Sequence, residues 1–141
     1  MMNEGARGEH ITFTVLGRPE TQGSVKAFMI AGKPRLTSDN KKMKPWRQQV
    51  GWSALEARGG AEMAMRGVPI VLGVTFYLAR PKSLPKRELW PTRKPDTDKL
   101  VRAILDSLTG VLYEDDSAVV EICARKVYGL PERAEITVEA L

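Results

Sequence analysis

Carboxylate side chains are concentrated in one stretch of this sequence, KPDTDKLVRAILDSLTGVLYEDDSAVV, which covers residues 94 to 120. The rest of the chain is rich in lysine and arginine. The acidic members of the stretch are Asp96, Asp98, Asp106, Glu114, Asp115 and Asp116. Magnesium prefers carboxylate and water oxygens, and a magnesium ion can activate water for phosphodiester hydrolysis. These residue types therefore point to metal-dependent hydrolysis.

Two of these aspartates are expected at the start of a helix. Because Pro95 disfavours helical geometry at the residue before it, Asp96 falls where the helix begins and Asp98 falls in the first turn. Asp115 and Asp116 follow the helix and lead into the next strand. We expect the chain to fold back there, so that Asp96, Asp98 and Asp116 share a magnesium ion. Asp115 is a lesser metal candidate, because adjacent strand residues point to opposite faces.

A simpler interpretation exists for each of these acids alone. Asp98, Arg102 and Asp106 are four residues apart and can form a ladder of ion pairs on a helix surface. On this simpler interpretation, Asp96 caps the helix and does nothing more. We assign Asp106 the structural role of a ladder member or of a residue that supports the metal ligands. The flanking basic segments nevertheless favour a metal site, with Lys99 or Arg102 assisting at a phosphate. The catalytic candidates are Asp96, Asp98, Asp116, Lys99 and Arg102.

The hydropathy pattern predicts an α/β (α+β) fold, a single compact domain with a β-sheet and two main helices. Predicted strands cover His10–Leu16, Val68–Leu78, Val119–Val127 and Glu135–Leu141. Predicted helices run from Lys44 to about Met65 and over Thr97–Leu108. Residues 21–39 form a hairpin or a basic loop, residues 79–95 a proline-rich basic loop, and residues 1–9 a flexible segment.

Length and charge narrow the possible functions. A chain of 141 residues suits one domain, and 22 basic against 17 acidic residues give a net charge of +5. That balance favours a polyanionic partner. The sequence contains neither the apolar stretch of a secretory signal nor a membrane span, so we expect a cytoplasmic protein without a membrane partner.

Thiol and histidine chemistry are poorly supported by this sequence. The single cysteine, Cys123, lies in an alternating stretch, where we expect a buried strand position. The single histidine, His10, lies near the N-terminus, which leaves no convincing base for nucleophilic catalysis. No organic cofactor is expected.

Basic side chains cluster between residues 26 and 58. The candidates for DNA contact are Arg18, Lys26, Lys33, Arg35 and Arg47, although basic side chains on loops are more often only solvated. Trp46, Trp52 and Trp90 can stack on exposed bases, but Trp46 and Trp52 are at least as well explained as core residues of a helix.

Around its aspartates the chain resembles the RusA family of Holliday junction resolvases, whose pattern is Asp-x-Asp-Asn-Leu-x-Lys, a helix, and an Asp-Asp pair before a strand. Here the residues are Asp96-Thr97-Asp98-Lys99-Leu100-Val101-Arg102, then Asp115-Asp116. The similarity extends to Gly17-Arg18-Pro19 after the first strand, Gln22-Gly23-Ser24 in a basic segment, and Lys44-Pro45-Trp46-Arg47 at the first helix.

The resemblance implies a fold with a mixed β-sheet flanked by the two helices. It also implies a homodimer that binds four-way or branched DNA and resolves Holliday junctions by paired phosphodiester hydrolysis, in DNA recombination and repair. It implies Mg²⁺ as the cofactor, with Mn²⁺ as a substitute, and places Asp96, Asp98 and Asp116 at the family's catalytic carboxylates. Two positions depart from the pattern: Lys99 replaces an asparagine and Arg102 replaces the catalytic lysine. Arginine keeps the charge but cannot lose a proton. The alternative is a non-catalytic module of the same fold that binds branched DNA.

Overall fold

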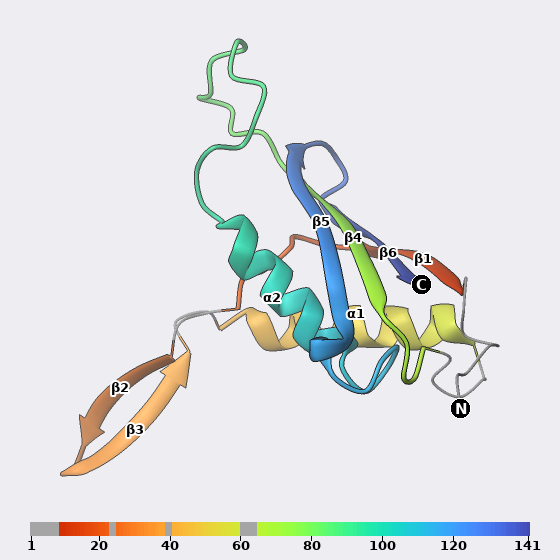
Figure 1. Ribbon diagram of the computed structural model, residues 1–141. Helices are drawn as coiled ribbons and strands as arrows, with labels where there is room; N and C mark the ends of the chain where they lie inside the picture. The colour runs from red at the N-terminus through yellow and green to blue at the C-terminus, as the bar shows by residue number, and fades with distance from the viewer. Residues whose placement is uncertain (1–8, 23–24, 39–40, 60–64) are drawn as a thin grey trace.

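The computed structural model describes residues 9–22, 25–38, 41–59 and 65–141, so most of the expected flexible segment 1–9 lies outside the described residues. The main sheet contains four strands in the order β1-β6-β4-β5 (Figure 1). These strands are β1 (His10–Leu16), β4 (Ile70–Leu78), β5 (Val119–Tyr128) and β6 (Arg133–Ala140). Strands β4 and β5 are parallel, whereas β6 is antiparallel to both β1 and β4. The mixed sheet of the prediction is confirmed.

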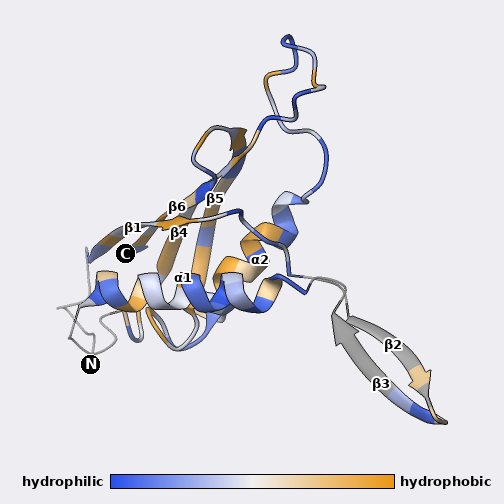
Figure 2. Ribbon diagram, turned by 180° about the vertical axis from the view of Figure 1, so that it is seen from behind, coloured by the Kyte–Doolittle hydropathy of each residue, from blue (hydrophilic) through white to orange (hydrophobic). Residues whose placement is uncertain are grey.

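Two helices, α1 (Met43–Arg58) and α2 (Thr97–Leu108), pack against each other, with α1 against β1 and α2 against β5. The strand β4 is buried at every second residue, which are Ile70, Leu72, Val74, Phe76 and Leu78. Figure 2 shows apolar colour on the sheet and on α2, with polar colour along the outer side of α1. Burial of this apolar layer is what holds the helices to the sheet. Within the described ranges, no helix is long and apolar enough to cross a membrane.

Two segments project from this body (Figure 1). One is a hairpin of β2 (Val25–Ile30) and β3 (Lys33–Ser38), which forms its own two-stranded sheet. Its turn, Ala31-Gly32, has φ angles of 51° and 77°, as a two-residue hairpin turn requires. The other is the stretch 79–95, which contains turns but neither helix nor strand. Of the two predictions for residues 21–39, the hairpin is confirmed.

Two predictions differ from the structure. Helix α1 ends at Arg58 rather than near Met65, because Gly59 adopts a φ of 76° that stops the helix; residues 60–64 lie outside the described residues. Cys123 is exposed rather than buried. It pairs with Gly73 on the sheet face opposite the buried residues of β4, and β5 lies at the sheet edge, where only one neighbouring strand covers it.

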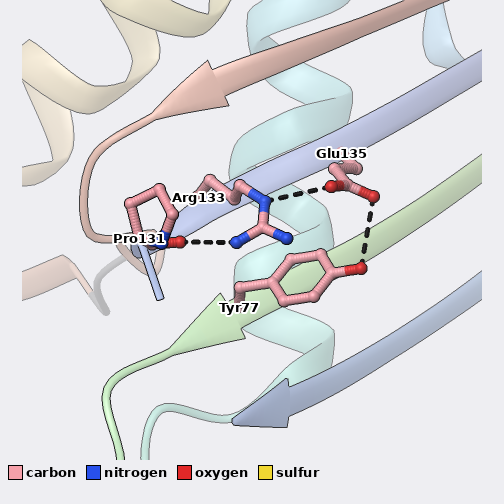
Figure 3. Close-up of polar contacts among 4 residues, drawn as sticks. All are labelled: Tyr77, Pro131, Arg133 and Glu135. Carbon is pink, nitrogen blue, oxygen red and sulfur yellow. Dashed lines mark hydrogen bonds and ion pairs between the residues drawn. The ribbon is translucent and has the colours of Figure 1, made fainter. Parts of the chain in front are cut away.

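Polar side chains occupy this second face of the sheet (Figure 3). The Arg133 guanidinium lies 3.6 Å from the centroid of the Tyr77 ring and donates to Glu135 at 3.0 Å and to the Pro131 carbonyl at 2.8 Å. The Tyr77 hydroxyl donates to the same carboxylate at 3.2 Å. These contacts satisfy charged groups over an aromatic surface, so this face needs no covering layer.

Because the core lies on one face of the sheet, we expect two strand leucines to contribute very differently to the free energy of unfolding. Leu72 on β4 is fully buried, whereas Leu16 at the end of β1 is 58% exposed. We expect Leu72→Ala to lower the free energy of unfolding by about 3 kcal/mol, because it removes apolar contacts and leaves a cavity. Leu16→Ala should change it by less than about 0.5 kcal/mol. Urea denaturation followed by circular dichroism measures both; equal losses would contradict the assigned core.

Candidate active site at the two ends of α2

Helix α2 presents its charged residues because its other side is buried. The buried residues are Leu100, Val101, Ala103, Ile104, Ser107 and Leu108. Asp96 lies at the N-cap with extended backbone angles, and Asp98 lies in the first turn. The carboxylate of Asp96 makes no capping hydrogen bond, and both aspartates are exposed. The Asp96 carboxylate is therefore not used to cap the helix, and both carboxylates are accessible to a ligand.

The cations of α2 lie in different environments. Lys99 places Nζ 3.7 Å from Oδ2 of Asp96. Arg102 is exposed and forms no ion pair with any residue that the structure describes. The alternative of a surface ladder through Asp98, Arg102 and Asp106 is not formed among those residues. The guanidinium of Arg102 is thus free to meet a phosphate.

A lysine that the sequence analysis did not single out fixes the start of α2. Lys126 on β5 donates from Nζ to the carbonyl of Arg93 at 2.6 Å and to the carbonyl of Pro95 at 2.8 Å. Pro95 is bonded directly to Asp96, so β5 holds the backbone on which the first carboxylate depends. Lys126 pairs with Phe76 in the register and lies on the helix side of the sheet. A lysine at an inward-facing strand position needs a specific polar partner there. The position of Lys126 in the alternating stretch Val119–Val127 was the sequence signal for such a partner, although it did not say which group the partner is.

The segment after β1 passes beside the same turn. The backbone N–H of Gln22 donates to the carbonyl of Lys99 at 3.0 Å, and Arg18 lines a cleft together with Lys94 and Pro95. The side-chain oxygen of Gln22 is buried and has no hydrogen-bond partner within the described ranges. Carboxylate, amide and basic groups therefore surround the first turn of α2.

The other aspartate pair lies beyond the end of α2. Asp115 precedes the short 3-10 helix η2 (Asp116–Ala118), and the carboxyl groups of Asp115 and Asp116 are close enough for each to shift the pKa of the other. Ser117 donates to Asp115 at 2.7 Å and lowers the pKa of that carboxyl. Loss of hydration, followed by the charge of Asp115, raises the pKa of Asp116. Asp115 and Asp116 precede β5 instead of alternating within it, so strand alternation does not decide between them. Which of the two faces a site stays a prediction.

The residues around this pair tie it to the last turns of α2. Tyr113 is buried and donates from its hydroxyl to the carbonyl of Leu105 at 2.9 Å. Burial raises the pKa of Tyr113, and the charges of Asp116, Asp106 and Asp115 raise it further. Asp106 therefore lies near the second pair, as its electrostatic effect on Asp116 also shows.

The two groups of aspartates are separated by the length of α2. This helix has 12 residues, which corresponds to a length of about 18 Å. Among the residues that the structure describes, no group of three His, Cys, Asp or Glu side chains can hold a metal ion. The expectation that Asp116 folds back beside Asp96 and Asp98 is not met within one chain. The sequence order places the second pair after the far end of the helix, and residues 109–113 fold into turns there instead of running back along α2.

The DNA-contact candidates fall into two places. Arg18 lies in the cleft at the start of α2, and Arg47 is half-buried on α1. Lys33 is exposed at the hairpin turn, while Lys26 and Arg35 have a described backbone only, on β2 and β3. The tryptophans also differ, since Trp46 is buried and Trp52 and Trp90 are exposed.

Comparisons with known proteins establish the family of this chain. The model of the family described as Endodeoxyribonuclease RusA matches residues 17–139. The chain is 34% identical over 138 residues to the uncharacterized protein YqaN of Bacillus subtilis (strain 168), an alignment that covers 91% of this chain and 94% of the relative. It is also 36% identical over 74 residues to the crossover junction endodeoxyribonuclease rusA of Lactococcus phage r1t, covering 52% of this chain and 56% of that protein. The chain belongs to the RusA endodeoxyribonuclease family.

Proposed function

We propose that this protein is a magnesium-dependent endonuclease that resolves Holliday junctions and related branched DNA by paired phosphodiester hydrolysis, in recombination and repair. The observation that carries the proposal is the pair of exposed, uncapped carboxylates at the start of α2, Asp96 and Asp98, surrounded by basic groups. Membership of the RusA family supports the nuclease class.

The donors at the start of α2 fit a hard cation. Mg²⁺ is commonly held by one or two carboxylates, with waters and substrate phosphates completing its shell. Asp96 and Asp98 supply such carboxylates. Gln22, whose side-chain oxygen has no hydrogen-bond partner among the described residues, contacts the same turn through its backbone. A magnesium ion bound there, or manganese in its place, would act as a Lewis acid: it would activate water and offset charge on phosphate oxygens.

The cations of the first two turns have distinct roles in this proposal. Arg102, which is exposed, binds a non-bridging phosphate oxygen and stabilises the charge that develops during hydrolysis. Lys99 neutralises Asp96 in the absence of DNA and moves to the phosphate when DNA binds. Lys126 acts as a positioning residue, because it fixes the backbone before Asp96.

Asp116 joins this site only if it comes from a second copy of the chain. A two-fold axis across the middle of α2 exchanges the two ends, so it brings the start of one helix towards the end of the other. Such a homodimer would place Asp116 of the second copy near Asp96 and Asp98 of the first. It would also present two cleavage sites related by symmetry, as paired nicks require.

The edge of β5 offers a surface for this second copy. Val120 is 63% exposed and Ile122 is 46% exposed on a strand that has one neighbour in the sheet. If two β5 strands pair antiparallel with Cys123 at the centre, Glu121 of each copy lies opposite Arg125 of the other. Opposite charges then meet across the two-fold axis, and an exposed sheet edge is covered.

A second candidate function is a non-catalytic module that binds branched DNA. The observation in its favour is the replacement of the family's asparagine and lysine by Lys99 and Arg102. An arginine cannot shuttle a proton, so turnover could be lost while the basic surface still binds DNA. Cleavage and binding must therefore be measured separately.

Replacement of one metal-site carboxylate should abolish cleavage of a labelled synthetic four-way junction. We expect paired nicks in magnesium, none in EDTA, and a rate at least about a hundredfold lower for Asp98→Asn, because that change removes a charged donor. Glu56→Gln, which neutralises an exposed acid on α1, is the control and should cleave normally. A junction that is bound but left uncut in magnesium and manganese alike would favour the binding module.

Mixing two inactive variants tests whether the site is shared between copies. Asp98→Asn and Asp116→Asn chains, refolded together, should form mixed dimers in which one of the two sites is intact. We expect these mixtures to nick one strand of the junction although each variant alone is inactive. Continued inactivity of a mixture whose heterodimers are verified by mass spectrometry would show that Asp98 and Asp116 are needed in the same chain.

Cysteine cross-linking tests the β5 interface. Directly opposed residues of antiparallel strands have Cα atoms about 4.5 to 5.5 Å apart, which lies within the range of a disulfide. We therefore expect copper-catalysed oxidation to yield a Cys123-linked dimer on a non-reducing gel, and Cys123→Ser to yield none. Failure to cross-link a chain that sediments as a dimer would place the interface elsewhere.

A further inference from the structure

The loop of residues 79–95 leads from the end of β4 to Asp96 and projects away from the sheet (Figure 1). It contains a single acid, Glu88, among many cations. The basic residues are Arg80, Lys82, Lys86, Arg87, Arg93 and Lys94. Most of the loop has the polar colour in Figure 2. Its charge fits a nucleic-acid backbone, and its C-terminal end places that contact beside the candidate active site.

Arg80 holds the two arms of this loop together. Its guanidinium donates to the carbonyl of Glu88 at 2.6 Å and to the carbonyl of Pro85, and it lies 5.4 Å from the centroid of the Tyr128 ring. Two turns follow one another inside the loop, closed by hydrogen bonds from Leu84 to Pro81 at 3.1 Å and from Glu88 to Pro85 at 3.0 Å. The loop therefore has a defined conformation, which lowers the entropy cost of binding.

The loop is also fixed near its C-terminal end, where it leads into α2, and by one buried leucine. Lys126 binds the carbonyl of Arg93, and Leu84 is buried. In contrast, Leu89 is 71% exposed and Trp90 is 57% exposed. A large indole that a defined, basic loop leaves in solvent is placed to contact something other than its own core.

We propose that Trp90 stacks on an unpaired or unstacked nucleobase at the branch point, so that loop 79–95 distinguishes branched DNA from linear duplex. The inference rests on the proposed function. Every base has an aromatic face that an indole can cover, but in a continuous duplex these faces are already stacked. Phosphate contacts from the flanking cations strengthen binding to both kinds of DNA, whereas the indole strengthens binding only where a base face is open.

Trp52 provides a matched comparison within the same chain. It is 70% exposed on α1, but its neighbours in the adjoining groove include Gln48, Ser53 and Glu56 and no cation. An exposed indole without basic neighbours has no phosphate contacts to bring it to DNA. Replacement of Trp52 should therefore not affect the choice between DNA structures.

The test measures binding separately from cleavage. In an Asp98→Asn background, fluorescence anisotropy gives the affinity for a four-way junction and for a linear duplex of the same length. We expect Trp90→Ala to lower the ratio of the two affinities about tenfold, Trp90→Phe to retain part of it, and Trp52→Ala to leave it unchanged. The Asp98→Asn chain should quench the fluorescence of a 2-aminopurine base at the branch point. The same chain with Trp90→Ala added should not.

Several outcomes would overturn the proposal. An unchanged ratio in Trp90→Ala would do so, as would an equal loss of affinity for both DNAs, which would indicate a general contact. A change from dimer to monomer in Trp90→Ala, measured by sedimentation, would assign the indole to a protein interface. If the parent chain does not prefer the junction, the proposed function fails as well, whereas a preference that survives Trp90→Ala overturns the stacking role alone.

Discussion

The packing of α2 against the sheet determines where the candidate metal-site aspartates lie. Six residues along one side of this helix are buried, so the helix cannot rotate or slide without exposing apolar surface. Its start is thereby held at the C-terminal end of β5, where Lys126 binds the preceding backbone, and its end is held near η2. The separation of the two aspartate pairs is a direct result of this packing, and it is the reason that the proposed metal site takes Asp116 from a second copy.

Parallel pairing of β4 and β5 accounts for the position of the long loop. Two parallel strands require a crossover connection, here the loop 79–95 and α2, which carries the chain from the end of one strand to the beginning of the next. The crossover must leave the sheet at the C-terminal end of β4. Asp96 and Asp98, the cleft with Arg18 and the loop that carries the exposed Trp90 follow from that end of β4.

Local patterns in the sequence predicted the elements well, and contacts between distant segments much less well. Helix α2 begins and ends where its apolar spacing and Pro95 indicated, and the four strands of the main sheet lie where alternation predicted strands. Alternation could not show that Cys123 lies on the uncovered face of an edge strand. Nor could spacing reveal the role of Lys126, or the distance between Asp98 and Asp116, because these depend on how β5 and α2 pack in space.

The anchoring of loop 79–95 has a consequence for how such proteins diverge. Arg80 secures the loop as far as Glu88, and Lys126 secures it from Arg93, so the short segment between these two residues can change length without disturbing either anchor. Doubling the length of a flexible loop costs only about 0.6 kcal/mol in closure entropy. Insertions and deletions in this segment can therefore be inherited while α2 stays in place. If the loop selects branched DNA as proposed, evolution can alter the choice of substrate there independently of the chemistry.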